Sequence, residues 1–310
     1  MEKGQDKMGG KAGNPYLSMA LLLVLWGSFS AVSKLTLQDL DGYQMMFLMF
    51  AFAFAIMTVI HMVTGELCKL SRISPGQFAL TALISLPSFL YYLLYFLALE
   101  RIPVIEAAVL NYLFPVFILV FSIPLNREKM QLYKLGSMIL GFAGMMVIIT
   151  NGKLQAIRLT NITGDLLAVG AAASWALFSV LGKTNGMDMK ISNYLTTAIS
   201  FMLSSACVLF FSRIKLPGLP ALGGALWLSG SNIVLGYYLW FRILKTTSSA
   251  IASSMSFITP FVAFLFIALL LHEKITAAHI AGLVLVMAGF VLQYLPAVIK
   301  PGDKNFTARG

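Results

Sequence analysis

The residues best suited to bind a ligand are neutral polar and aromatic side chains that fall halfway along long apolar runs. Trp26 and Trp175 lie in the middle of two such runs, and Asn111 and Asn232 lie in two others. An Asn in an apolar setting requires hydrogen-bond partners, and aromatic faces attract apolar groups or cations. No Asp, Glu, Lys or Arg falls at the centre of a run, where a charge would cost about 2.5–3.5 kcal/mol. This absence disfavours a buried proton relay.

The composition predicts a polytopic membrane protein whose main partner is the lipid bilayer. Apolar residues make up 59% of the 310 residues and charged residues 11%, and mean hydropathy is +0.85. These values exclude a water-soluble globule. The net charge of +10 is explained by basic loops between spans, so no nucleic-acid partner is expected. Cys68 and Cys207 have no disulfide or metal-site spacing, and no cofactor or metal is expected.

Apolar runs divided by loop residues predict an all-α fold with ten transmembrane helices. The expected spans are residues 16–33, 43–64, 78–99, 104–123, 133–150, 163–183, 193–212, 221–244, 249–270 and 276–297. Only short connectors remain between them.

An internal repeat divides these spans into two halves. At an offset of 149 the matched residues are Trp26, Phe29, Ser30 and Lys34 with Trp175, Phe178, Ser179 and Lys183. At an offset of 145 they are Tyr92, Tyr95, Phe96, Leu99, Pro115, Glu128, Lys129 and Gly144 with Tyr237, Trp240, Phe241, Leu244, Pro260, Glu273, Lys274 and Gly289. Because each half has five spans, the second must cross the membrane in the opposite sense, as an inverted repeat.

The expected organisation follows from this repeat and from the basic residues. The predicted parts are an N-terminal tail 1–15, a first repeat 16–150, an external linker 151–162, a second repeat 163–297 and a C-terminal tail 298–310. Of the 22 Lys and Arg residues, 15 fall on the side of the termini and 7 on the other. This asymmetry predicts a multi-pass plasma-membrane protein with both termini in the cytoplasm.

The doubled motifs resemble the drug/metabolite transporter superfamily, specifically its EamA-like branch, over roughly residues 16–297. The motifs are Trp26-Gly27, Trp175-Ala176, Tyr95-Phe96-Leu97-Ala98-Leu99 before Pro115, Trp240-Phe241-Arg242-Ile243-Leu244 before Pro260, Glu128-Lys129, Glu273-Lys274, and the small pairs Ser137 with Gly144 and Gly282 with Gly289. The resemblance implies export of small metabolites through a central cavity, with the fifth and tenth helices outside it.

Two prolines mark candidate hinges beside binding groups. Pro115 and Pro260 lie near the centres of the fourth and ninth spans, and each frees the carbonyl four residues earlier. Those carbonyls belong to Asn111 and Ser256, which also carry polar side chains. Substrate binding at these breaks is one interpretation. The other is that each proline kinks a packed helix whose freed carbonyl bonds to a neighbouring Ser or Thr.

Aromatic residues are expected to form the walls of a substrate site. Trp26 and Trp175 are equivalent mid-helix residues, and Tyr91 and Tyr95 share one face of the third span. Asn232 is placed at the same depth in the eighth span, where substrate contact and bonding between helices are both open. These residues, together with Asn111 and Ser256, are the predicted substrate-binding set.

Glu106 is the one carboxylate inside an apolar run. It lies about one turn from the outer end of the fourth span. An acid in a first helical turn is stabilised by the helix dipole. The alternative role is a binding site for a substrate amine or a coupling proton.

The function predicted from these features is secondary active export of a small polar or amphipathic metabolite, of the amino-acid or amine class. Alternating access through a central cavity is the expected mechanism. A membrane-embedded enzyme and a non-transporting membrane subunit are the alternatives. The enzyme is disfavoured because no nucleophile and base, and no metal-binding cluster, lie at matching depth.

Overall fold

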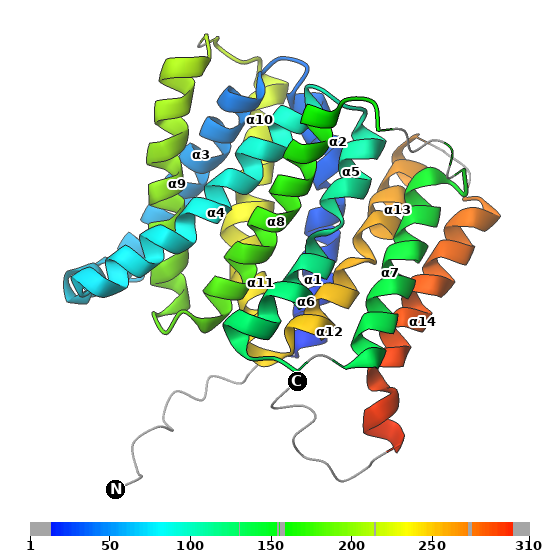
Figure 1. Ribbon diagram of the computed structural model, residues 1–310. Coiled ribbons are helices and arrows are strands. Elements are labelled where there is room, and N and C mark those ends of the chain that lie inside the picture. The colour runs from blue at the N-terminus through cyan, green and yellow to red at the C-terminus, as the bar shows by residue number, and fades with distance from the viewer. Residues whose placement is uncertain are drawn as a thin grey trace, which may run out of the picture.

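A computed structural model describes residues 14–129, 131–153, 155, 159–213, 215–271 and 275–299. The N-terminal tail through residue 13, the C-terminal tail from residue 300 and the Glu273-Lys274 pair lie outside these residues. All longer regular elements in the described part are helical (Figure 1). They are α1 (Pro15–Gly27), α2 (Phe29–Thr36), α3 (Gly42–Val63), η1 (Glu66–Arg72), α4 (Pro75–Leu99), α5 (Val104–Asn111), α6 (Phe114–Asn126), α7 (Leu132–Thr150), α8 (Ile162–Thr184), α9 (Met189–Phe211), α10 (Leu219–Leu228), η3 (Ser229–Val234), α11 (Leu235–Thr246), α12 (Ser249–Ser256), α13 (Thr259–Leu271) and α14 (Ala277–Ile299).

The described helices agree with the expected polytopic membrane fold. Eight helical stretches are long and apolar enough to cross a membrane, and two shorter apolar helices, Pro15–Gly27 and Ala277–Gln293, stand first and last. Four spans are built from two or three helical pieces: α1 with α2, α5 with α6, α10 through η3 to α11, and α12 with α13. Of the ten predicted spans, the first and the eighth were expected to be continuous helices, and the structure interrupts both.

Polar caps explain where several helices begin. The Asp41 side chain accepts the amide of Gln44 at the start of α3, and Asn161 accepts the amide of Gly164 at the start of α8. A Ser74 and Gln77 capping box begins α4. Such side chains satisfy amides that have no partner inside the helix, so each cap fixes the point at which the next span starts.

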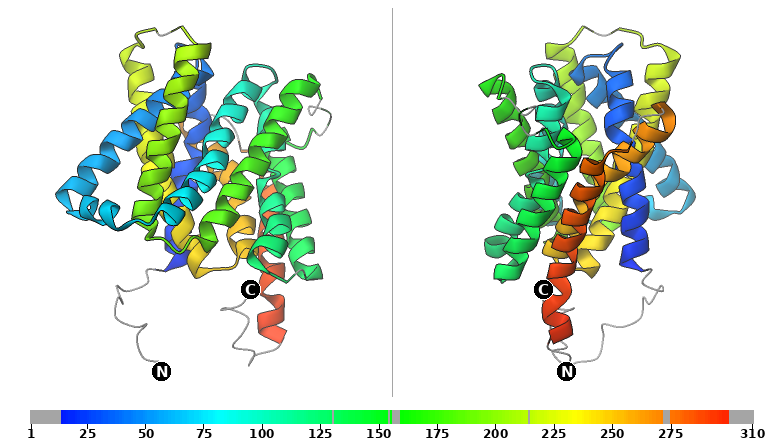
Figure 2. Two further views of the ribbon diagram at one scale, coloured as in Figure 1. Left: turned by 60° about the vertical axis from the view of Figure 1, so that its left-hand side comes forward. Right: turned by 90° about the vertical axis from the view of Figure 1, so that its right-hand side faces the viewer.

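The helix packing repeats itself when the two halves are exchanged. Helix α4 packs against α8 while its counterpart α11 packs against α1, and α6 packs against α8 while α13 packs against α1. The equivalent helices α3 and α9 contact each other, as do α7 and α14. This pattern is that of a two-fold relationship between two five-span repeats. The start of α1 and the end of α14 lie at the same end of the bundle (Figures 1 and 2).

Helices α7 and α14 form a close pair at one edge of the bundle (Figure 1). A β-carbon added at Gly144 would lie 2.5 Å from the Gly282 carbonyl oxygen, and one added at Gly289 would lie 2.8 Å from the Ser137 carbonyl oxygen. The spaced small residues therefore serve backbone contact between these two helices. The rest of the bundle surrounds a central site.

Candidate functional site: a central aromatic cavity

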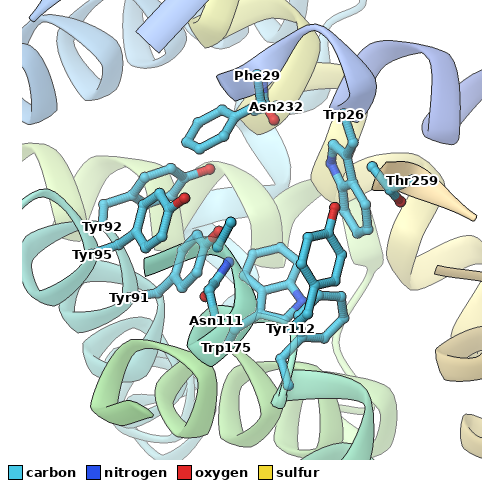
Figure 3. Close-up of a pocket in the computed structure, with 12 residues that line it drawn as sticks. Trp26, Phe29, Tyr91, Tyr92, Tyr95, Asn111, Tyr112, Trp175, Asn232 and Thr259 are labelled. Atoms are coloured by element: carbon cyan, nitrogen blue, oxygen red, sulfur yellow. The ribbon is translucent and has the colours of Figure 1, made fainter. Parts of the chain in front are cut away.

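A central cavity lies among the helix pieces (Figure 3). Its lining residues are Trp26, Phe29, Tyr91, Tyr92, Tyr95, Ala108, Asn111, Tyr112, Phe114, Trp175, Asn232 and Thr259. They come from both repeats, and none of them belongs to α7 or α14.

Helix breaks place much of this lining. Phe29 follows the interruption at Ser28, and Tyr112 lies in the break between α5 and α6. Thr259 begins α13, directly after the break that follows α12, and Asn232 lies in the π-helical turn η3. Each discontinuity thus turns side chains toward the cavity, as expected for irregular backbone at this depth in a membrane protein.

The aromatic walls meet at steep angles. The ring centroids of Trp26 and Trp175 are 5.6 Å apart with an interplanar angle of 77°, and Tyr91 lies 5.0 Å from Trp175. Tyr91 and Tyr95 stack with centroids 6.1 Å apart. The two indoles therefore form a corner of the cavity, and the stacked tyrosines continue the wall along α4.

Two amides supply polar groups to this aromatic site. Asn111 is 8% exposed, and its Oδ1 has no hydrogen-bond partner among the described residues. An unpaired buried acceptor costs about 1–3 kcal/mol. The Asn232 amide nitrogen donates to the Ser231 hydroxyl at 2.9 Å, which directs its carbonyl oxygen elsewhere. A ligand with an N–H or O–H donor would complement the Asn111 oxygen.

The structure brings together six of the seven residues that the sequence singled out for substrate binding. Those six are Trp26, Tyr91, Tyr95, Asn111, Trp175 and Asn232. Ser256 lies apart from this lining, because it ends α12 and its hydroxyl donates to the Ser253 carbonyl at 2.6 Å. Thr259 reaches the cavity instead.

Both hinge candidates lie at the second residue of a helix. The fourth and ninth spans are interrupted directly before Pro115 and Pro260, which lie in the first turns of α6 and α13. The carbonyl of Ser256 accepts the Thr259 hydroxyl at 2.7 Å. A neighbouring Thr thus satisfies the carbonyl that Pro260 frees, as the packing interpretation requires.

Glu106 does not line the cavity. It is 2% exposed in the first turn of α5, and its two carboxylate oxygens accept the Thr160 amide at 2.7 Å and the Thr160 hydroxyl at 2.8 Å. The Asp165 carboxyl, in the first turn of α8, is within hydrogen-bond reach of Glu106. Glu106 therefore ties the start of α5 to the segment that precedes α8.

Six lining residues were outside the predicted binding set: Phe29, Tyr92, Ala108, Tyr112, Phe114 and Thr259. The internal repeat carried a signal for several of them. Phe29 and Tyr92 belong to the repeated motifs, and Phe114 and Thr259 are equivalent residues directly before the two prolines. Position within the repeat was therefore a second guide, in addition to depth along a span.

Comparison with known proteins decides the family. The sequence model of the EamA-like transporter family matches residues 14–150 and 162–295. This chain belongs to the EamA-like transporter family. It is consequently a multi-pass membrane transporter and not an enzyme.

Relatives of this EamA-like transporter cover most of its length. An uncharacterized transporter of Bacillus subtilis is 27% identical, covering 89% of this chain and 90% of that protein. An uncharacterized transporter of Archaeoglobus fulgidus is 24% identical, covering 89% and 96%. A probable amino-acid metabolite efflux pump of Salmonella typhimurium is 26% identical, covering 53% and 58%. One crystal structure matches with a TM-score of 0.79 at 19% identity, covering 91% of this chain and 98% of that one, which supports the fold.

In this transporter, a layer of buried aromatic side chains, formed by Phe178, Tyr237 and Trp240, borders one side of the cavity. Trp240 and Tyr237 are fully buried, and Phe178 packs against Tyr237 with centroids 5.0 Å apart. The Trp240 indole donates to the Ser179 hydroxyl at 2.8 Å, and the Tyr237 hydroxyl is 2.7 Å from the hydroxyl of Ser88. These residues follow Trp175 and Asn232 along α8 and α11, toward the end of the bundle where α1 begins (Figure 1).

The repeat gives these buried rings equivalents in the cavity wall. Phe178, Tyr237 and Trp240 are equivalent to Phe29, Tyr92 and Tyr95, respectively. The first-half residues line the cavity and the second-half residues do not, although rings contact one another in both sets. Equivalent parts of the two repeats therefore have different environments in this structure.

An ion pair lies beyond the aromatic layer. Nζ of Lys183 is 2.8 Å from Oε1 of Glu128, which also accepts the hydroxyl of Ser249 at 2.6 Å. Burial alone would raise the pKa of Glu128, but the Lys183 ammonium and the Ser249 hydrogen bonds outweigh it and hold the pKa below its usual value. The three residues join the ends of α6, α8 and α12.

Proposed function

We propose that this transporter is a secondary active exporter of a small polar or amphipathic metabolite, of the amino-acid or amine class. Its substrate would cross the plasma membrane by alternating access through the central cavity. The moving units would be the two five-span halves, 16–150 and 163–297, with both termini in the cytoplasm.

The observation that carries this proposal is that Phe29, Tyr92 and Tyr95 line the cavity while their repeat equivalents do not. The layer of Phe178, Tyr237 and Trp240 separates the cavity from the end of the bundle where α1 begins. That end is cytoplasmic in the orientation that the basic residues predict. If the two repeats exchange conformations, these rings would line the cavity, and their equivalents in the first half would close the opposite side. One site would thus face each side in turn.

The chemistry of the lining supports a small organic substrate. Aromatic rings can bury an apolar body, and the amides of Asn111 and Asn232 can bind a polar group. The name of the Salmonella typhimurium relative, a probable amino-acid metabolite efflux pump, agrees with this class. We place the candidate coupling proton at Glu106, where Asp165 is the adjacent acid.

The direct test is efflux from proteoliposomes that contain the purified protein alone. The vesicles would be loaded with a mixture of amino acids and monoamines, and the retained compounds measured by mass spectrometry over time. We expect selective loss of one or a few compounds, with no such loss from protein-free vesicles. Equal retention of every compound by both kinds of vesicle would contradict the proposal for these substrate classes.

A further inference from the structure

The cavity lining carries no formal charge. Eight of its twelve residues are aromatic, and the others are Ala108, Asn111, Asn232 and Thr259. A bound anion would lose its hydration and gain no cationic partner from these residues. Aromatic faces are the negative regions of a ring, so they repel an anion and attract a cation. The walls therefore favour positive charge over negative charge.

Four backbone amides in the breaks of the fourth and ninth spans add no free donor to the cavity. The amides of Tyr112 and Leu113 donate to the carbonyls of Ala108 and Leu110. At the second break, the amides of Phe257 and Ile258 donate to the preceding turn in the same way. Pro115 and Pro260 have no amide hydrogen. These amides are thus committed within the chain, unlike those of an anion site at a helix start.

The ring geometry suits a cation near the corner of the two indoles. The Trp26 and Trp175 rings meet edge to face with planes 77° apart, so a group bound beside this contact can lie over a ring face of either indole. Tyr91 lies 5.0 Å from Trp175 and adds a third ring to this corner. Several ring faces around one point form the kind of aromatic cage that binds organic ammonium groups.

The polar groups of the cavity favour an ammonium that has N–H donors. The Oδ1 atom of Asn111 is buried and has no partner among the described residues. One N–H of the Asn232 amide is bound to Ser231, and its carbonyl oxygen is a second acceptor for a ligand. An N–H donor would satisfy the Asn111 oxygen, whereas a carboxylate would meet that oxygen as a like partial charge.

We infer that the cavity binds its substrate as an organic monocation, a primary or secondary ammonium group attached to an apolar body. The ammonium lies at the corner formed by Trp26, Trp175 and Tyr91, and donates to Asn111. This inference refines the substrate class within the proposed function.

The test uses four compounds that share one phenyl-containing body and differ in charge. They are 2-phenylethylamine, phenylalanine, 2-phenylethanol and 3-phenylpropanoate, titrated against the purified transporter at pH 7 by quenching of tryptophan fluorescence and by thermal shift. We expect the amine to bind about tenfold or more tightly than the alcohol, with the zwitterion and the acid weaker still. Equal affinity for the amine and the alcohol, or tighter binding of phenylalanine or the acid, would overturn the inference.

Variants identify the groups responsible for this selectivity. Asn111→Leu should lower affinity for the amine and leave affinity for the alcohol nearly unchanged, while Asn111→Asp should increase the preference for the amine. Tyr91→Phe keeps the ring face and should retain amine binding, whereas Tyr91→Leu should weaken it. No effect of either Asn111 change would also contradict the inference.

Transport of the same compounds separates this inference from the proposed function. If the amine binds with the expected preference but is not moved in proteoliposomes, the cavity chemistry is as inferred and the transport proposal fails for this compound. If phenylalanine is exported and the amine neither binds nor moves, export is supported and the monocation inference is wrong.

Discussion

Lys183 and Glu128 form an ion pair that joins the end of α8 to the segment after α6, with Nζ 2.8 Å from Oε1. Their side chains are 18% and 8% exposed. The pair is further fixed by Ser249 at the start of α12. Because it lies on the same side of the cavity as the buried aromatic layer, it is placed to stabilise closure toward the predicted cytoplasmic end.

Removal of the Glu128 charge should open this end of the transporter. Glu128→Gln leaves the Lys183 ammonium without its carboxylate. If the closed form loses about 1.4 kcal/mol of stability, the equilibrium between the closed and open forms shifts tenfold toward the open form. Ser253 is the repeat equivalent of Ala108, which lines the cavity. Labelling of a Ser253→Cys reporter in the Cys68→Ser, Cys207→Ser background, with a thiol reagent applied from the cytoplasmic side, should therefore become faster.

A matched control for this experiment is Glu66→Gln. Glu66 also pairs with a lysine, since Lys190 Nζ lies 2.7 Å from its Oε1. Its ion pair joins η1 to α9, away from the cavity lining. Equal labelling rates in Glu128→Gln and in the parent would show that the Lys183 pair does not hold this end closed.

The same ion pair predicts acid sensitivity. The pKa of Glu128 is lowered in the folded protein, so its contribution is present above the unfolded value of about 4.3 and is lost as pH falls through the folded value. Cytoplasmic labelling of Ser253→Cys should therefore rise as pH falls below about 4.3. After correction for the pH dependence of the reagent, the rise should be absent in Glu128→Gln. A rise of the same size in both proteins would assign the effect to other groups.

The two indoles of the cavity should be required for transport. Trp26→Ala and Trp175→Ala each remove one wall of the corner and should lower kcat/KM about tenfold or more. Helix content should stay near that of the parent. Phe210→Ala is the control, because Phe210 is 80% exposed and does not line the cavity. Parental transport by both tryptophan variants would rule out an aromatic site at this position.

Spacing along the sequence predicted most of the fold because apolar length and an internal repeat are strong signals. The membrane spans and the placement of Trp26 and Trp175 needed no tertiary information. Ser256 lies outside the cavity lining because α12 ends at this residue. The length of an apolar run does not indicate where such a short break falls. Asn232 entered the cavity through the π-helical turn η3, whereas the equivalent Pro87 lies inside the continuous helix α4. The two repeats thus share a sequence pattern and differ in local backbone.

Glu106 offers a direct test of proton coupling. Its carboxylate bonds to Thr160, and Asp165 lies within hydrogen-bond reach. Adjacent buried carboxyl groups favour one shared proton, because two charges at this separation repel strongly. Glu106→Gln and Asp165→Asn should therefore reduce substrate-driven proton movement, measured with a pH-sensitive dye inside proteoliposomes. Unchanged proton movement and unchanged flux at every pH would assign Glu106 to positioning Thr160.

The paired prolines should control the rate of conformational exchange. Pro115 and Pro260 begin the second pieces of the fourth and ninth spans. Substitution by Ala supplies an amide that can extend the hydrogen bonding of each helix across the break. Pro115→Ala and Pro260→Ala should therefore lower the maximal transport rate several-fold while equilibrium binding stays near parental.

Binding variants at the same two breaks separate a hinge from a binding element. Asn111→Ala should mainly weaken substrate binding, since its side chain lines the cavity. Ser256→Ala should change neither substrate affinity nor transport rate strongly, because the Ser256 hydroxyl bonds within its own helix. Equilibrium binding and transport rate, measured for the same variants, distinguish the two roles. A change at a hinge alters the transport rate, whereas a change in the cavity lining alters substrate affinity. If the proline variants lose affinity and keep their maximal rate, Pro115 and Pro260 shape the cavity and the hinge assignment is wrong.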